Sequence, residues 1–407
     1  MSTIQRRDVG RVLVAASLVV IAGLTLYPDP GAATADWRCI FCGTRGAADM
    51  ILNVFLFAPL GSGLALAGVR HRNAFAIAAV VSAAVELAQT AIPGRDASIG
   101  DLLANSAGSG LGFGLVVLAR YWLTPAENLA RWLVLSAALA VAACAALTGV
   151  MLQPAFTDST YYGQWTPRLR HLDPYGGSVL EATIGTLPMP STRLDSTVAI
   201  ARLLRRGSPI RVRTVAGPPT TRLSALFSIA DAERNRLVLL GLRGRDLYYR
   251  LRMRAESFRL DRPTVIVRDV MASAVGDTVV IAVWREGSGY CVAVGGDDEC
   301  DLGFTPGSGW TLLQFVESAP SWLQQLANAV WMCLLLVPLG YWMRPNVHSL
   351  FGGCIVVAAL LLVPAATGLL AMPVFEWAGA VAGVGLGLAV RAGMDRGRHH
   401  YRLRTTA

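Results

Sequence analysis

Polar side chains that hydrocarbon should exclude lie within long apolar stretches of this sequence. Glu86 and Gln89 are three residues apart, so a helix would place them on one face. An ionised carboxylate in the middle of a membrane span costs on the order of 2.5 to 3.5 kcal/mol on insertion scales. Other polar groups must therefore compensate the Glu86 carboxylate.

Candidate partners occur on the neighbouring stretches. A tight turn over residues 93–96 follows the stretch that carries Glu86, and Asp101 and Asn105 then lie one helical turn apart. Asp49 and Asn53 lie near the start of an earlier stretch. All of these residues together predict one shared ligand-binding site, made of Asp49, Asn53, Glu86, Gln89, Arg95, Asp101 and Asn105.

Several chemistries fit these residues. They form either an interhelical hydrogen-bond network with an Arg95–acid pair, or a headgroup pocket in which Arg95 binds phosphate and the carboxylates and amides bind hydroxyls or amines. In an enzyme, Glu86 or Asp101 would be the general base and Arg95 the phosphate clamp. None of the five histidines lies near these residues, and the sequence has no paired metal motif and no nucleophile beside a base. We therefore expect binding more than catalysis, with no metal or cofactor.

The composition indicates a membrane protein. Of the 407 residues, 54% are hydrophobic and 15% are charged, whereas soluble domains carry roughly 25% charged residues. A membrane helix needs about 20 mostly apolar residues. About eight stretches qualify, at residues 11–27, 50–69, 74–92, 101–119, 132–151, 324–343, 349–367 and 374–391. No clean cleavage site follows the first stretch, so we expect it to be a retained signal anchor.

Arginines predict the orientation. With a cytoplasmic N-terminus, every connection expected inside carries arginine, as the positive-inside rule requires. These residues are Arg6, Arg7, Arg11, Arg70, Arg72, Arg120, Arg131, Arg344, Arg391, Arg396, Arg398, Arg402 and Arg404. We therefore expect a multi-pass protein of the bacterial inner membrane with both termini in the cytoplasm, residues 153–320 outside, and the predicted site facing outward. A transporter would need charges deep in several spans and polar residues on both sides, so it ranks last.

The cysteines agree with an oxidising outer compartment. We expect a disulfide between Cys291 and Cys300, across a short turn rich in glycine and aspartate, and this bridge would add about 2 to 3 kcal/mol of stability. Cys39 and Cys42 are expected to form a small disulfide, with half a zinc knuckle or a redox pair as the alternatives. The three other cysteines, Cys144, Cys333 and Cys354, fall within predicted spans.

The exported segment has strand-like periodicity from 178 to 315. Ile210, Val212 and Thr214 alternate with Arg211 and Arg213, and similar alternation recurs near 247–254 and 279–283. Turn clusters separate these runs at intervals of about 10 residues, which predicts an antiparallel β-sandwich. The runs "IRVRTVAGPPTTRLSALFSIAD" and "NRLVLLGLRGRDLYYRLRMR" resemble the concanavalin-like jelly roll of the laminin G type.

That resemblance implies glycan binding and, in some members, calcium binding. The calcium candidates lie in an acidic turn that could equally be a solvated hairpin tip: Asp297, Asp298, Glu299 and Asp301. Aromatic residues could form a face that stacks on sugars, or they could be core residues: Tyr161, Tyr162, Trp165, Tyr248, Tyr249, Trp284 and Tyr290.

The N-terminal stretches resemble a known family. "DMILNVFLFAPLG" and "ELAQTAIPGRDASIGDLLANSAGSGLG" are similar to the two hallmark stretches of the VanZ-like membrane family, over about residues 10–120. The resemblance implies a bacterial envelope protein of the kind associated with glycopeptide (teicoplanin) resistance. Membrane lipids and a lipid-linked or cell-wall glycan are the expected partners, and nucleic acid is not.

A degenerate repeat links the two ends of the chain. "APLG" after Asn53 is echoed by "VPLG" after Asn328, and the spacing of Asp101, Gly108 and Gly112 recurs in Glu376, Gly383 and Gly387. The second copy lacks counterparts of Glu86, Gln89 and Arg95, so we expect it to be a scaffold. The alternative to a true repeat is chance similarity between apolar helices. The expected domains are a VanZ-like membrane domain at 1–152, the sandwich at 153–320, and three further spans with a basic tail at 321–407.

Overall fold

The structure is a computed structural model that describes residues 3–28, 38–95, 97–169 and 172–405. Asp96 of the predicted turn lies outside these residues, as do the side chains of Arg398, Arg402 and Arg404. The chain divides into two compact units. The first comprises Met1–Ser136, Glu256–Asp261 and Trp342–Ser349, and the second comprises Ala137–Ala255, Arg262–Tyr341 and Leu350–Ala407.

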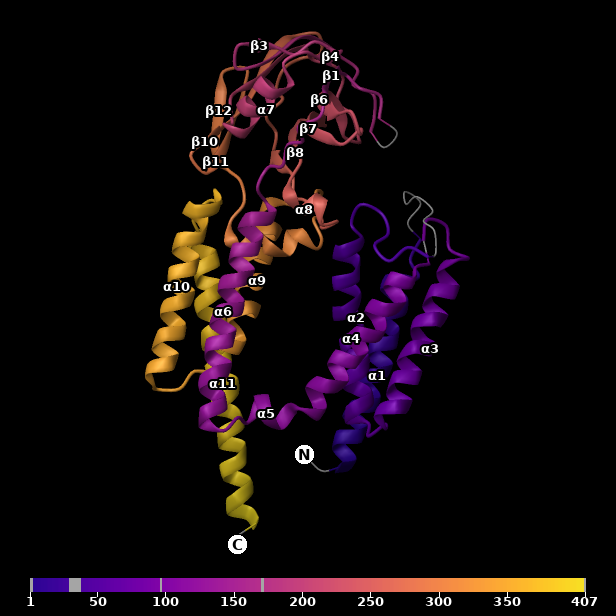
Figure 1. Ribbon diagram of the computed structural model, residues 1–407, viewed down its shortest axis with the longest axis vertical. Helices are drawn as coiled ribbons and strands as arrows, with labels where there is room; N and C mark the ends of the chain where they lie inside the picture. The colour runs from indigo at the N-terminus through magenta and orange to yellow at the C-terminus, as the bar shows by residue number, and fades with distance from the viewer. Residues whose placement is uncertain (1–2, 29–37, 96, 170–171, 406–407) are drawn as a thin grey trace. The chain divides into compact units, whose positions relative to one another are not determined.

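The first unit is built on four helices that lie side by side (Figure 1). They are α1 (Thr3–Thr25), α2 (Gly46–Leu66), α3 (His71–Gln89) and α4 (Ile99–Val117). The short α5 (Ala119–Leu123) leads to α6 (Glu127–Met151), which runs from the first unit into the second. The helical part of the second unit contains most of α6, with α9 (Ser321–Trp342), α10 (Val347–Thr367) and α11 (Val374–Thr405).

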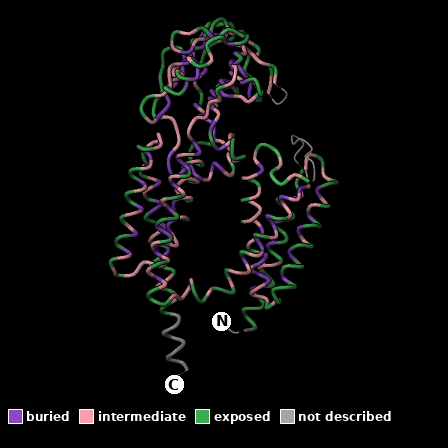
Figure 2. Tube along the Cα trace, in the orientation of Figure 1, coloured by how far each residue is buried: buried purple, intermediate pink, exposed green. Residues whose placement is uncertain are grey.

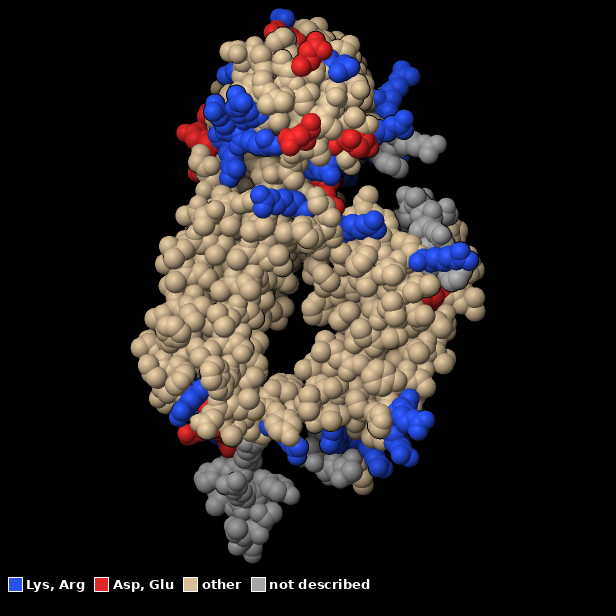
Figure 3. Space-filling model, in the orientation of Figure 1, with Lys and Arg blue, Asp and Glu red and all other residues tan. Residues whose placement is uncertain are grey.

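Six helices of the described chain are long and apolar enough to cross a membrane, namely α1, α2, α6, α9, α10 and α11. On the face seen in Figure 3, charged side chains gather at the helix ends and on the β-strand region, while the sides of the helices are mostly uncharged. The protein is therefore a multi-pass membrane protein.

The helices α3 and α4 coincide with two further predicted spans but are not among the six. Each is 19 residues long, which is about the length that a membrane span needs. Glu86 and Gln89 on α3, and Asp101 and Asn105 on α4, lower their apolar character. The count of about eight spans therefore stays a prediction.

Twelve described strands between α6 and α9 form two antiparallel sheets of six strands each. One sheet has the order β4-β1-β6-β7-β8-β9, and the other has the order β12-β11-β10-β5-β2-β3. The strands are β1 (Tyr161–Trp165), β2 (Ser178–Ile184), β3 (Leu187–Pro188), β4 (Arg193–Leu194), β5 (Ile210–Val215), β6 (Ser224–Asp231), β7 (Arg236–Arg243), β8 (Asp246–Leu251), β9 (Val265–Val267), β10 (Thr278–Glu286), β11 (Gly289–Val294) and β12 (Asp297–Leu302). Short helices α7 (Thr197–Arg205), α8 (Arg254–Ser257) and η1 (Pro306–Leu312) complete the region.

A single hydrophobic cluster joins the two sheets. It contains buried residues from both, including Ile229 of β6, Leu240 of β7, Val212 of β5 and Ile281 of β10 (Figure 2). The predicted alternation is confirmed on β5, where residues 210, 212 and 214 are buried and 211 and 213 are exposed. On β8 it fails, because Tyr248 is buried in a second cluster with residues such as Leu223 and Leu239.

The structure bears on two groups of side chains for which the sequence left alternatives open. The four acids considered for calcium lie on strand β12 rather than in a turn, and because successive side chains on a strand point to opposite faces, Asp298 points away from Asp297 and Glu299. Four of the aromatic residues considered for sugar stacking belong to the buried core: Tyr161, Tyr248, Tyr249 and Tyr290.

Both expected disulfides are present. Cys291 and Cys300 link β11 to β12, and Cys39 and Cys42 close a small loop before α2. Cys291, Cys300 and Glu286 lie close enough together to resemble a metal site, but the two sulfurs are bonded to each other. The thiolates that a metal would need are thus consumed.

Candidate functional site

The polar residues predicted from the sequence gather at one end of the first unit. The helices alternate in direction, so α1 and α3 end where α2 and α4 begin. Hydrogen bonds join residues of all four helices at this end. Residues that are far apart in the sequence therefore share one level of the bundle.

Ser98 is the centre of this arrangement. It caps the N-terminus of α4: its Oγ accepts a hydrogen bond from the backbone N–H of Asp101 at 2.9 Å and lies 2.9 Å from Asp101 Oδ2, to which it donates. Its backbone N–H donates to Glu86 Oε2 at 2.8 Å. One residue thus binds carboxylates from both α3 and α4.

Asn53 adds α2 to the site. Its Nδ2 donates to Asp101 Oδ1 at 2.7 Å. We call Asn53, Glu86, Ser98 and Asp101 the Ser98 cluster. The first turn of α4 also favours the negative charge of Asp101, because the free N–H groups of a helix start carry partial positive charge. All of the cluster except Ser98 is only half-buried, so a molecule outside the bundle can reach it.

Gln89 and Arg95 donate hydrogen bonds to the end of α1 rather than to the Ser98 cluster. Gln89 Nε2 donates to the carbonyl oxygen of Thr25 at 3.1 Å. Arg95 Nε donates to the carbonyl of Tyr27 at 2.8 Å, and its Nη2 donates to that of Leu24 at 3.1 Å. The last carbonyls of a helix lack partners within the helix, so Arg95 closes the C-terminus of α1. Two of its nitrogens are thereby used.

Asn105 lies one turn deeper on α4 and is 2% exposed. Its Nδ2 donates to Ser82 Oγ on α3 at 3.0 Å. Within the described chain, its Oδ1 is buried without a hydrogen-bond partner, and so is Oε1 of Gln89. Both unpaired atoms are acceptors, and burying a polar atom in this way costs about 1 to 3 kcal/mol.

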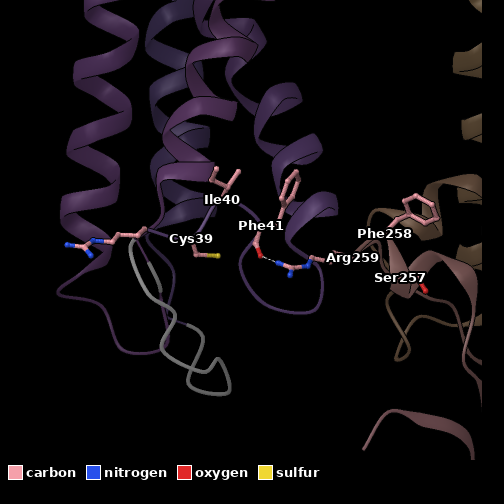
Figure 4. A pocket seen from close by; sticks show the side chains of 7 residues that line it. Cys39, Ile40, Phe41, Ser257, Phe258 and Arg259 are labelled. Atoms are coloured by element: carbon pink, nitrogen blue, oxygen red, sulfur yellow. Dashed lines mark hydrogen bonds between the residues drawn. The ribbon is translucent and has the colours of Figure 1, made fainter. Parts of the chain in front are cut away.

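Asp49 lies close enough to Asp101 and Arg95 to interact with both electrostatically. It is exposed in the first turn of α2, one helical turn before Asn53. Beside it, Arg45 forms an ion pair with Asp261 at 3.5 Å, within the first unit. Arg259 of the same short segment donates a hydrogen bond to the carbonyl of Phe41 at a shallow pocket of about 570 Å³ (Figure 4).

Glycines let α2 and α4 approach closely enough to form the site. The backbone of Gly108 faces the carbonyl of Val54, and Gly112 faces that of Ala58. A side chain at either glycine would overlap these carbonyl oxygens. The G-x-x-x-G spacing seen in the sequence is therefore a helix contact.

The sequence prediction missed Ser98 and Ser82. Ser98 was detectable, because Ser-x-x-Asp immediately before an apolar stretch is a typical helix start. Ser82 carries no comparable pattern; only the packing of α3 on α4 pairs it with Asn105.

The helices that carry this site match a known protein family. The model of the VanZ/LLP1 family matches residues 8–120. These residues form a VanZ-like domain. The match contains α2, α3 and α4 in full and every residue of the predicted site, and it confirms the resemblance predicted over about residues 10–120. No curated protein and no solved structure matches the chain.

The site of the VanZ-like domain offers mainly hydrogen-bond acceptors. Two half-buried carboxylates are offered, while two nitrogens of the guanidinium at this end are bound to carbonyls. Such a site favours a ligand that donates hydrogen bonds.

Proposed function

We propose that the VanZ-like domain recognises the headgroup of a lipid-linked or cell-wall glycan at the outer face of the bacterial inner membrane. The observation that carries the proposal is the convergence of side chains from α2, α3 and α4 on Ser98 at one end of the domain. A bundle held together only by packing has no need of two half-buried carboxylates there, since each is costly near hydrocarbon.

The proposed orientation does not depend on the number of spans. The helices α3 and α4 form a consecutive pair, so counting both or neither leaves α6 running in the same direction. With the arginine-rich N-terminus in the cytoplasm, residues 153–320 then lie outside and the C-terminus inside. The Ser98 cluster lies on the outer side in the eight-span arrangement.

We propose that the β-strand region is a sandwich of the concanavalin/laminin G type that binds glycan or a protein partner. Its two antiparallel sheets and their common core support this proposal. In the cell, the protein would support envelope maintenance or resistance to glycopeptides such as teicoplanin.

An enzyme that modifies the headgroup is the alternative. It would use Glu86 or Asp101 as a base and Arg95 as a clamp for phosphate. The hydrogen bonds of Arg95 to the carbonyls of Leu24 and Tyr27 favour the binding role, because a phosphate would have to compete for them.

Lipid analysis tests the binding role. We expect wild-type protein purified from bacterial membranes to carry a glycolipid that mass spectrometry detects, and the double variant Glu86→Gln/Asp101→Asn to lose most of it. Asp8→Asn, an exposed carboxylate at the other end of α1, is the matched control and should keep the lipid. Equal retention by the wild type and the double variant would refute the site.

Incubation with undecaprenyl-linked cell-wall precursors separates binder from enzyme. The proposal predicts saturable binding with an unchanged precursor mass. A time-dependent mass change that the double variant lacks would instead support the enzyme.

A further inference from the structure

The C-terminal helices repeat the arrangement of the VanZ-like domain. In each half, the second and third helices are joined by a short connection, residues 67–70 between α2 and α3 and residues 343–346 between α9 and α10. An internal proline lies in α2 and in α9, at Pro59 and Pro338. Residues 26–45 separate the first two helices of the first half, whereas the whole β-strand region occupies the corresponding place between α6 and α9.

The contacts between helices repeat as well. In the first half, the backbone of Gly108 faces Val54, Gly112 faces Ala58 and Gly61 faces Ser109. In the second half, the matching contacts join Gly383 to Cys333, Gly387 to Val337 and Gly340 to Val384. In all three contacts, the residue numbers on α11 differ from those on α4 by one constant, and those on α9 differ from those on α2 by another constant. Chance similarity does not account for this agreement.

The carboxylate–amide pair is repeated too. Glu376 is the third residue of α11, as Asp101 is of α4. Asn328 Nδ2 on α9 donates to Glu376 Oε1 at 2.9 Å, as Asn53 on α2 donates to Asp101, although relative to the glycine contacts Asn328 lies one helical turn earlier on its helix than Asn53 does. The second half, expected from sequence to be a scaffold, therefore holds a polar site of the same design.

In the second half, the chain itself fills this site. Residues 303–320, which we call the strap, run from β12 to α9 and include η1. Thr305 Oγ1 donates to Glu376 Oε1, and the backbone N–H of Gly307 donates to Oε2 at 3.2 Å. Trp310 Nε1 donates to Asn328 Oδ1 at 2.7 Å. Glu376 is 0% exposed, which is tolerable only because its oxygens are bonded.

The donors of the strap are a hydroxyl, a backbone amide and an indole N–H, all uncharged. In the VanZ-like domain, the loop before α2 also packs on the start of α4, where Cys39 accepts a hydrogen bond from the backbone N–H of Gly100. Glu86 and Asp101 nevertheless stay half-buried there. The N-terminal site thus presents several separated acceptors, which a group with several hydroxyls satisfies better than a single ammonium ion does.

We propose that the N-terminal site takes an uncharged group rich in hydroxyls and amides, such as an N-acetylated sugar, which donates to Glu86 and Asp101 as the strap donates to Glu376. The ligand's phosphate, if it has one, lies outside this contact. This inference rests on the proposed headgroup recognition and specifies the part of the headgroup that is bound.

The test compares probes that share one alkyl chain. The full-length protein, in phosphatidylcholine nanodiscs, is titrated with an alkyl N-acetylglucosaminide, an alkyl phosphate and an alkylammonium salt. We expect saturable binding of the glycoside alone. Glu86→Gln/Asp101→Asn should weaken it on the order of tenfold to a hundredfold, the usual contribution of hydrogen bonds to charged groups. Asp8→Asn should leave it unchanged.

The outcomes separate this inference from the proposed function. Binding of the phosphate or the ammonium probe in place of the glycoside, abolished by the same double variant, would overturn the inference and leave headgroup recognition standing. Saturable binding of none of the three probes would overturn both. The circular dichroism of each variant must match the wild type, so that lost binding is not lost folding.

Discussion

At the scale of single residues, the stability of the site depends on whether its buried hydrogen-bond acceptors are paired with donors. The Asp101 carboxylate accepts two hydrogen bonds, from Asn53 Nδ2 and from the Ser98 hydroxyl, while the backbone N–H of Asp101 donates to Ser98 Oγ. Removing one donor leaves a charged oxygen partly desolvated, which costs more than the bond contributed.

Asn53→Ala tests this dependence. Because Asp101 Oδ1 loses its amide donor, we expect the free energy of unfolding of the VanZ-like domain to fall by about 1 to 3 kcal/mol. The measurement is thermal or denaturant unfolding of the purified protein in detergent. Asn73→Ala, at an exposed position in the first turn of α3, should change stability far less, and equal losses would contradict the role of Asn53.

Tyr249 of β8 gives a prediction of pH dependence outside the membrane. Burial raises its pKa well above the ordinary value of 10, and the nearby Tyr290 adds to the shift. A folded-state pKa above the unfolded value means that the stability is fully present below about pH 10 and falls as the pH rises further. We expect tyrosinate absorbance to show late-titrating tyrosines, and Tyr249→Phe to remove one of them. The same late titration in Tyr249→Phe would contradict the assignment.

At the scale of elements, glycine decides which helices pair. Gly112 faces the backbone of Ala58 across α2 and α4, while Gly114 has open space around its Cβ position. Gly387 and Gly385 form the equivalent pair on α11, with Gly387 against Val337 of α9. The two halves therefore offer the same test.

Gly112→Ala should destabilise the first half and Gly387→Ala the second, each by about 1 to 3 kcal/mol, because the added methyl forces two backbones apart. Gly114→Ala and Gly385→Ala are the matched controls, and both should be neutral or slightly stabilising, since alanine favours helix. Thermal unfolding in detergent measures all four. Indistinguishable melting of Gly387→Ala and Gly385→Ala would contradict the packing of α9 on α11.

Most elements were predictable because their patterns are local. Runs of apolar residues predicted the helices, and the alternation at Ile210, Val212 and Thr214 predicted β5. Tyr248 was misplaced because burial on the second face of a sheet depends on what covers it, here Leu223 and Leu239. The acids of β12 were placed in a turn because the true turn, at Gly295 and Gly296, comes two residues before Asp298.

The residues predicted to share a site lie at one end of the bundle, but the sequence did not show how they pair. Helix direction alone brought Glu86, Asp101 and Asn53 to one end of the bundle. The sequence could not show that Ser98 joins them, or that Arg95 binds the carbonyls of α1, because both depend on distances across the turn between α3 and α4.

At the scale of the whole molecule, the chain contains two four-helix halves of one design, with a β-strand region inserted in the second. The family match covers the first half, at residues 8–120. We infer that the second half keeps the carboxylate–amide pair but closes it with its own strap, and that the first half leaves the pair for a ligand.

A topology measurement tests the proposed orientation. A reporter inserted after Pro154 should be active only outside the cytoplasm, and one inserted after Gly68, between α2 and α3, only inside it. The reason is that an odd number of spans precedes the first position and an even number precedes the second. A cytoplasmic signal after Pro154 would overturn both the orientation and the outward-facing site.

The most direct test of headgroup recognition is photo-crosslinking. Wild-type protein in nanodiscs is irradiated with a glycolipid that carries a photoreactive group on its sugar, and the labelled peptides are mapped by mass spectrometry. The account predicts labels near Asn53 and between Ser82 and Asn105, lost in Glu86→Gln/Asp101→Asn. Labels confined to residues 153–320, or labels at the Ser98 cluster that the double variant retains, would contradict it.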